Sequence, residues 1–293
     1  MLTGATSFAQ QDAQFTQYMY NTISINPAYA GSRGAMSIFG LYRTQWVGLD
    51  GAPKTATVSM NTPINDSKLG VGLSFLSDEI GPTKERAISA DISYTVPVSE
   101  NYKLSFGIKA TGNFFSLDAA MLNPAQQMDP TLQNVSKVSP NIGAGLYLHS
   151  DHGYVGLSVP NFIENKKEYD VNRGSIYTEE MNYYLIAGYV FDLSPNLKFK
   201  PALLSKVVVG APLQADVSAN FMLFDKLVLG AAYRWDAAFS AMAGFQVTDG
   251  LYIGYGYDHE TTNLQTYNSG SHEIFLRFEF FNNYNKLISP RFF

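Results

Sequence analysis

The chain has 293 residues, of which 46% are apolar, 14% are aromatic and only 15% are charged. An average soluble domain carries roughly 25% charged residues, so this composition is unusual for a protein surrounded by water. The net charge of −5 has the wrong sign for a protein that binds nucleic acid through a basic face. Because the chain has no cysteine, disulfides, thiolate metal sites and cysteine nucleophiles are excluded.

The first nine residues resemble the end of an export signal. Ser7-Phe8-Ala9 places small residues at the −3 and −1 positions before the polar run Gln10-Gln11-Asp12. No basic region precedes them, so an ordinary N-terminus is the alternative interpretation. No stretch reaches 18 uninterrupted apolar residues. Export without a spanning helix leaves a soluble secreted protein or an outer-membrane barrel.

From residue 35 onward the dominant pattern is an alternation of apolar with small or polar residues. It is clearest over residues 69–75, 104–110, 215–221 and 274–280. A period of two predicts strands with one apolar and one polar face. Most of the fourteen expected strands run about ten residues, the length that crosses a membrane at a tilt. The strands are expected near residues 35–45, 54–63, 68–77, 86–97, 102–114, 139–149, 153–160, 182–192, 197–208, 214–224, 226–236, 238–247, 250–259 and 271–281.

The lengths of the connections favour a membrane barrel over a soluble sandwich. Connections after even-numbered strands are short and rich in turn residues. The long connections 46–53, 78–85, 115–138, 161–181 and 260–270 all follow odd-numbered strands. Outer-membrane barrels have short periplasmic turns and longer outer loops, whereas a sandwich has no reason to sort its loops in this way. We therefore expect an all-β fold, a transmembrane antiparallel β-barrel in the bacterial outer membrane.

The chemistry of the two strand faces agrees with this fold. Apolar side chains would meet the lipid of the outer membrane, and the opposite face carries charges of both signs that can pair in a hydrated lumen. Aromatic residues near strand ends are typical of interfacial girdles. The candidate lumen residues are Arg43, Lys109, Arg234, Asp258, Arg277 and Glu279.

Several motifs resemble the PorP/SprF family, outer-membrane proteins of the type IX secretion and gliding-motility machinery of Bacteroidetes-type bacteria. The most specific are Asn26-Pro27-Ala28-Tyr29-Ala30-Gly31 and the segment 45–53, QWVGLDGAP. The resemblance runs from about residue 12 to the end. It implies a protein that binds and anchors a secreted surface adhesin through the adhesin's C-terminal domain. Some relatives work with ring-forming periplasmic lipoproteins, and others resemble carriers of hydrophobic compounds.

Three of the motifs, at residues 46–53, 80–84 and 267–271, fall in outer connections, where they would form a partner-binding rim. Gly gives the backbone freedom and Pro fixes φ, so such loops hold a defined shape with little bulk. Aromatic residues on a rigid rim suit the docking of a folded domain. The alternative is that the motifs only tie the rim together. The candidate partner-binding residues are Trp46, Val47, Leu49, Asp50, Pro53, Ile80, Pro82, Lys84, Pro212, Tyr267 and Asn268.

The expected organisation has four parts. Residues 1–9 are a signal-peptide remnant, residues 10–33 an N-terminal segment, residues 34–281 the barrel and residues 282–293 a C-terminal tail. The N-terminal segment either plugs the lumen, with Asn26-Pro27-Ala28-Tyr29 turning the chain into the first strand, or hangs into the periplasm. We favour the plug because this segment is too apolar to remain in water.

No pattern in the chain predicts an enzyme. The four histidines are not spaced as a metal site, and neither a phosphate loop nor a dinucleotide fingerprint is present. We expect no cofactor and no nucleic-acid partner. Three functions remain open: an anchor for an exported adhesin, a translocon component attached to the periplasmic lipoprotein ring, and a transporter of hydrophobic compounds. The charged lumen face makes the transporter the weakest of the three.

Overall fold

The computed structural model of the protein describes residues 15–64, 67–122, 134–170 and 174–280. The signal-peptide remnant expected at residues 1–9 and the tail expected at residues 282–293 lie outside the described residues. In the described part, no helix is long and apolar enough to cross a membrane. The described chain is built from strands, with short 3₁₀ turns between some of them.

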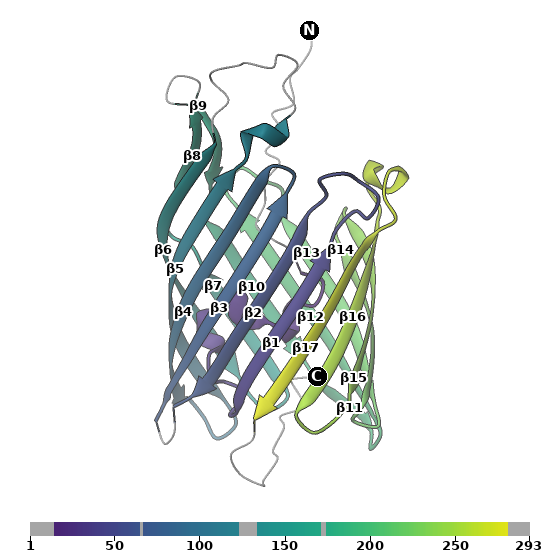
Figure 1. Ribbon diagram of the computed structural model, residues 1–293. Coiled ribbons are helices and arrows are strands. Elements are labelled where there is room, and N and C mark those ends of the chain that lie inside the picture. Colours follow the sequence, from purple (N-terminus) through teal and green to yellow (C-terminus); the bar gives the residue numbers. More distant parts are fainter. Residues whose placement is uncertain (1–14, 65–66, 123–133, 171–173, 281–293) are drawn as a thin grey trace.

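Fourteen antiparallel strands close into a barrel (Figure 1). Consecutive strands of the wall pair with one another, β7 pairs with β10 across a separate hairpin, and β1 pairs with β17 to close the wall. The short β11 continues the line of β10 after Val190, and both pair with β12. The bounds are β1 Met36–Thr44, β2 Lys54–Pro63, β3 Leu69–Ile80, β4 Thr83–Pro97, β5 Lys103–Leu117, β6 Val135–His149, β7 Gly153–Val159, β10 Asn182–Tyr189, β11 Phe191–Ser194, β12 Leu197–Val208, β13 Gln214–Leu223, β14 Leu227–Arg234, β15 Ala238–Gln246, β16 Leu251–Glu260 and β17 Ser271–Phe280.

The strands are apolar outside and polar inside, the reverse of a soluble protein. On β5, Phe106 and Ile108 point outward with 47% and 62% of their surface exposed, whereas Ser105 before them and Lys109 after them are buried. Because an outer-membrane barrel meets hydrocarbon on its outer face, this alternation places the apolar side chains where lipid solvates them. The predicted fold and all fourteen predicted strand positions are confirmed.

The two ends of the barrel differ, as the parity of the loops predicts. At the periplasmic end, β13 and β14 are joined through Phe224 and Asp225, both with φ of 54°, which is the geometry of a tight hairpin turn. At the outer end, the connection between β7 and β10 contains a separate hairpin, β8 Asn165–Asp170 and β9 Gly174–Glu179. This hairpin stands above the rim in Figure 1.

One expected outer loop does not exist. The connection predicted at 78–85 is a turn of two residues, Gly81 and Pro82, because β3 and β4 extend to Ile80 and Thr83. The sequence pattern misses this extension because the alternation of apolar residues ends near Phe75, where the strands leave the hydrocarbon layer. Ile80 and Lys84 are therefore strand residues rather than loop residues.

Candidate functional site

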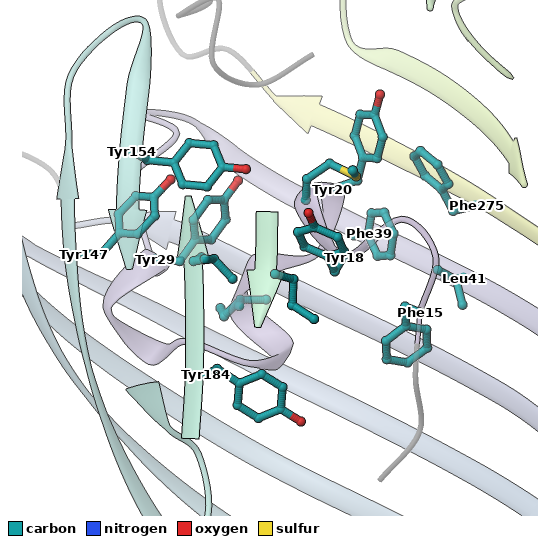
Figure 2. Close-up of a cluster of buried hydrophobic side chains, with 14 of the residues drawn as sticks. Phe15, Tyr18, Tyr20, Tyr29, Phe39, Leu41, Tyr147, Tyr154, Tyr184 and Phe275 are labelled. Carbon is teal, nitrogen blue, oxygen red and sulfur yellow. The ribbon is translucent and has the colours of Figure 1, made fainter. Parts of the chain in front are cut away.

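Residues 15–34, here called the luminal segment, run through the interior of the barrel. The segment folds into three 3₁₀ turns, Tyr18–Tyr20, Thr22–Ser24 and Pro27–Tyr29. Nearly all of its side chains from Phe15 to Ala30 are buried. Figure 2 shows its Tyr18, Tyr20 and Tyr29 among wall residues such as Tyr147 and Phe275. The aromatic side chains of this stretch are therefore buried inside the barrel rather than exposed to water.

The outer part of the luminal segment is held by a buried cluster of charges. Arg43 Nη2 lies 2.7 Å from Asp258 Oδ2, and Arg43 Nη1 lies 3.3 Å from Glu273 Oε2. Glu273 accepts hydrogen bonds from the backbone N–H groups of Thr16 and Gln17, both at 3.0 Å. Arg43 also donates to Thr16 Oγ1 at 2.9 Å. One arginine and two carboxylates on β1, β16 and β17 thus fix the position where the segment begins its path along the lumen.

The middle of the segment rests on the wall formed by β4, β5 and β6. Lys109 Nζ donates to the carbonyl oxygens of Ile23 and Ser24 at 3.1 and 3.2 Å and lies 3.4 Å from Asp91 Oδ1. The side chain of Asn26 is completely buried, donates to Leu146 O at 2.9 Å and accepts from Ala28 N at 2.9 Å. Asn26 therefore caps its own turn and ties that turn to β6.

Glycines in the wall make room for the segment. A Cβ atom on Gly107 of β5 would lie 2.1 Å from Ala28 N, and one on Gly145 of β6 would lie 2.1 Å from Asn26 Oδ1. A backbone nitrogen and a buried amide oxygen that approach this closely leave no space for a side chain at either glycine. The Asn26–Gly31 motif is thus the part of the luminal segment that fits directly against the barrel wall.

The segment leaves through the periplasmic end. Ser93 Oγ donates to Ala30 O at 2.7 Å, and Gly31, at φ of 71°, donates to Asn61 Oδ1 at 3.3 Å. Arg33 forms a buried ion pair with Glu279 on β17. The turn into β1 is made by residues 31–34, so the expectation that residues 26–29 make this turn is wrong. Those residues lie against β5 and β6, where Gly107 leaves room for the backbone of Pro27 and Ala28 and Gly145 leaves room for the amide of Asn26.

All six candidate lumen residues point inward. Arg43, Lys109, Asp258, Arg277 and Glu279 are buried, as is Arg234, which lies 2.9 Å from Asp216 through Nε. They do not line an open hydrated channel, because the luminal segment occupies the space between them. Arg277, for example, packs over the ring of Tyr252, 4.8 Å from its centre.

Three outer connections join into one surface, here called the rim surface: residues 45–53, the turn 81–82 and residues 263–271. Val47 N donates to Gly270 O at 2.9 Å, and Ser269 N donates to Val47 O at 2.8 Å. Gly81 N donates to Gly51 O at 2.9 Å. Trp46 has a φ of 46°, and its indole Nε1 donates to Glu260 Oε1 at 2.9 Å. The motifs therefore do tie the rim together. Because the connections are hydrogen-bonded to one another, the exposed side chains stand on a surface of defined shape.

The candidate partner-binding residues divide by exposure. Tyr267 is 70% exposed and Val47 38%, and Asp50 and Lys84 are also exposed. Trp46, Leu49, Ile80, Pro82 and Asn268 are half-buried, and Pro53 is buried. Pro212 is exposed on the separate loop between β12 and β13, and in the described part of the chain no hydrogen bond joins that loop to the rim surface.

Some features of the site have no clear sequence signal. A cavity of about 160 Å³ remains between the luminal segment and the outer halves of β2 to β5, bordered by Ile25, Leu76 and Phe115. Another, of about 290 Å³, lies at the periplasmic mouth and is bordered by Lys68, Lys103 and His149. Inward glycines such as Gly107 and Gly145 could have indicated an occupied lumen, because a hydrated lumen does not require them.

Among the described residues, no group of three His, Cys, Asp or Glu side chains could hold a metal ion.

The closed barrel, its apolar outer face and its filled lumen define an outer-membrane β-barrel protein. Residues 7–278 match the family described as "Type IX secretion system membrane protein PorP/SprF". The protein belongs to the PorP/SprF family, and the predicted family and outer-membrane location are confirmed.

Solved structures with a similar fold share little sequence with this chain. The outer-membrane protein Omp33 of Acinetobacter baumannii has a TM-score of 0.49 and 10% identity, over 84% of this chain and 98% of that one. A Pseudomonas aeruginosa FadL homologue has a TM-score of 0.44 and 14% identity, over 84% and 89%. The KdgM porin has a TM-score of 0.41 and 6% identity, over 84% and 99%. A search of curated proteins gave no match.

Proposed function

We propose that this protein is a non-enzymatic anchor that binds an exported cell-surface adhesin, through the adhesin's C-terminal domain, at the rim surface. Membership of a type IX secretion family supports a role at the outer membrane alongside exported proteins. The observation that carries the proposal is the hydrogen-bonded union of residues 45–53, 81–82 and 263–271, with Tyr267 and Val47 exposed on it.

A pre-formed surface is suited to holding a large partner. Ordering flexible loops at an interface opposes binding by roughly 0.5–1.5 kcal/mol for each immobilised side chain. Because Val47 and Gly51 are already hydrogen-bonded to the neighbouring connections, the backbone of these loops is ordered before the partner arrives. Exposed aromatic side chains on such a surface are the residue type that most often dominates binding energy.

A second candidate function is attachment to periplasmic lipoproteins of the secretion machinery. It is favoured by the cavity at the periplasmic mouth, whose border includes Lys68, Lys103 and His149 and, among the described residues, no acidic side chain. Such a cavity suits an acidic segment of a periplasmic partner. The filled lumen argues against the third candidate, a transporter of hydrophobic compounds, because the luminal segment occupies the path along the barrel axis.

Co-purification tests the anchor proposal. The native protein is extracted from outer membranes in mild detergent, and the proteins that accompany it are identified by mass spectrometry. We expect a large exported protein to accompany the wild type and to be lost from the double variant Val47→Asp/Tyr267→Ala. The matched control is Trp235→Ala, because Trp235 is also 70% exposed at the outer end but lies outside the rim surface. Retention of the exported protein by the double variant would contradict the proposal, and recovery of periplasmic lipoproteins alone would favour the second candidate.

A further inference from the structure

The lipid-facing wall is recessed along the seam between β7, β10 and β12. Outward residues elsewhere on the wall are widely exposed, for example Ile88 on β4 at 54% and Ile108 on β5 at 62%. Ala187, Pro201 and Leu203 also point outward, but their side chains are half-buried. The difference arises because small residues stand here between larger neighbours.

The register explains the shape of the recess. Ala187 pairs with Val155 on one side and with Leu203 on the other. Beyond them, Leu148 pairs with Val155, and Val217 pairs with Leu203. One alanine therefore lies in the middle of a row of four larger apolar side chains. Gly153, which pairs with Tyr189, extends the low floor toward the periplasmic end. Together these residues border a groove of about 560 Å³.

The hydrogen-bonded wall is also interrupted at this groove. Pairing of β10 with β12 stops at Gly188 and Ala202 and resumes between β11 and β12 at Phe191 and Phe199. Pro201 has no backbone N–H, so it cannot donate to a ladder. The groove thus arises from the backbone pairing of the wall and does not depend on the rotamer of a single side chain.

The groove ends at the periplasmic boundary of the hydrocarbon layer. Below it, aromatic rings cross three neighbouring strands, with centres 4.8 Å apart for Tyr189 and Phe191 and 4.9 Å apart for Phe199 and Phe221. Next to them, His152 Nε2 lies 3.3 Å from Asp192 Oδ2, and Lys198 forms an ion pair with Asp225. Aromatic rings followed by charged groups mark the level of the lipid headgroups.

We propose that this groove binds one acyl chain of a glycerophospholipid from the periplasmic leaflet as a specific, slowly exchanging ligand. Its border is almost wholly apolar, with tyrosine hydroxyls as its polar side-chain groups. The outer face of a transmembrane barrel meets hydrocarbon, and the polar and charged residues at the foot of the groove lie at headgroup level. The volume lies in the range of sites that enclose most of a small ligand. The site is independent of the rim surface and of any bound adhesin.

Photolabelling tests the site. The purified full-length protein is reconstituted into vesicles of phosphatidylethanolamine and phosphatidylglycerol that contain phosphatidylethanolamine with a diazirine in its acyl chain. Labelled residues are mapped by mass spectrometry. We expect labelling on β10 and β12 around Ala187 and Leu203 to exceed that on other lipid-facing strands at least fivefold after correction for exposure. Ala187→Phe fills the groove and should remove this excess. The control Ala90→Phe adds the same ring to an exposed, outward position of β4 and should leave it unchanged.

Three results would overturn the proposal. Labelling that simply follows exposure around the barrel would show ordinary boundary lipid. Labelling of the groove that is equal in Ala187→Phe and Ala90→Phe would show that the recess does not select the chain. If a cross-linker at position 187 in native membranes instead captures a lipoprotein anchor or a second copy of the protein, the groove is occupied by that partner and not by a phospholipid chain. Circular dichroism of both variants confirms that each barrel has folded before labelling.

Discussion

The backbone nitrogen of Ala28 lies 2.1 Å from the point that a Cβ atom on Gly107 would occupy. One residue belongs to the luminal segment and the other to the middle of β5, so the wall and the segment are shaped for each other. This contact predicts that the luminal segment is a permanent part of the folded protein rather than an appendage that happens to enter the pore.

Replacing Gly107 by alanine should therefore displace the luminal segment or the strand. Because the atoms in the way are backbone atoms that cannot rotate aside, we expect a loss of about 3 kcal/mol or more, the upper end for overpacked sites. Thermal unfolding followed by circular dichroism measures it. Gly40→Ala is the control, since a Cβ atom at Gly40 meets nothing within 4 Å. Equal unfolding temperatures for the two variants would show that the segment is not held against β5.

Replacing Arg43 by methionine should leave Asp258 and Glu273 buried with their common cation removed. Removal of one partner from a buried ion pair destabilises a fold by about 3–5 kcal/mol. The same change at Lys84, whose pair with Glu79 is exposed on the rim, should alter stability by less than about 1 kcal/mol. Chemical unfolding of both variants in the same detergent makes the comparison. A small effect at Arg43 would mean that its carboxylate partners are not buried as described.

The filled lumen predicts a barrel that does not conduct. The wild-type protein in a planar lipid bilayer should show no steady ion current, whereas deletion of residues 15–33 should produce one, because the wall alone is wide enough to enclose water. A steady current through the wild type, equal to that of the deletion variant, would show that the segment does not block the lumen.

Trp46→Ala should loosen the rim surface, because it removes the indole hydrogen bond to Glu260. The expected result is faster proteolytic cleavage within residues 45–53 and 263–271, at an unchanged unfolding temperature of the barrel. Trp235→Ala, outside the rim surface, should leave the cleavage rate unchanged. Cleavage that is equally slow in both variants would mean that Trp46 does not hold the loops.

The barrel could be predicted from the sequence because each strand carries its own evidence. Alternation along residues 104–110 or 274–280 is a local property, and lipid outside with polar groups inside imposes it on every strand. The alternation of short and long connections along the chain can likewise be read from the sequence without knowing the fold. The extension of β3 and β4 beyond the membrane was missed for the same reason, since the alternation stops where lipid stops.

The interior could be predicted only in part. The charges on the inward face were visible in the sequence, but not their partners. Arg43 meets Asp258 and Glu273 only because β1 closes against β17, more than 200 positions away. The path of the luminal segment depends on glycines on several strands, and no local pattern shows that these face the same residues. The groove at Ala187 likewise arises from three strands and is invisible in any one of them.

Site-specific photocrosslinking in living cells tests the central claim most directly. A photoreactive amino acid is placed at Tyr267, on the rim surface, or at Lys68, at the periplasmic mouth, and the captured proteins are identified by mass spectrometry. An anchor for an exported adhesin should capture a large exported protein from position 267 and not from position 68. Capture of periplasmic lipoproteins from position 68, with none of an exported protein from position 267, would contradict the anchor and move the function to the periplasmic face.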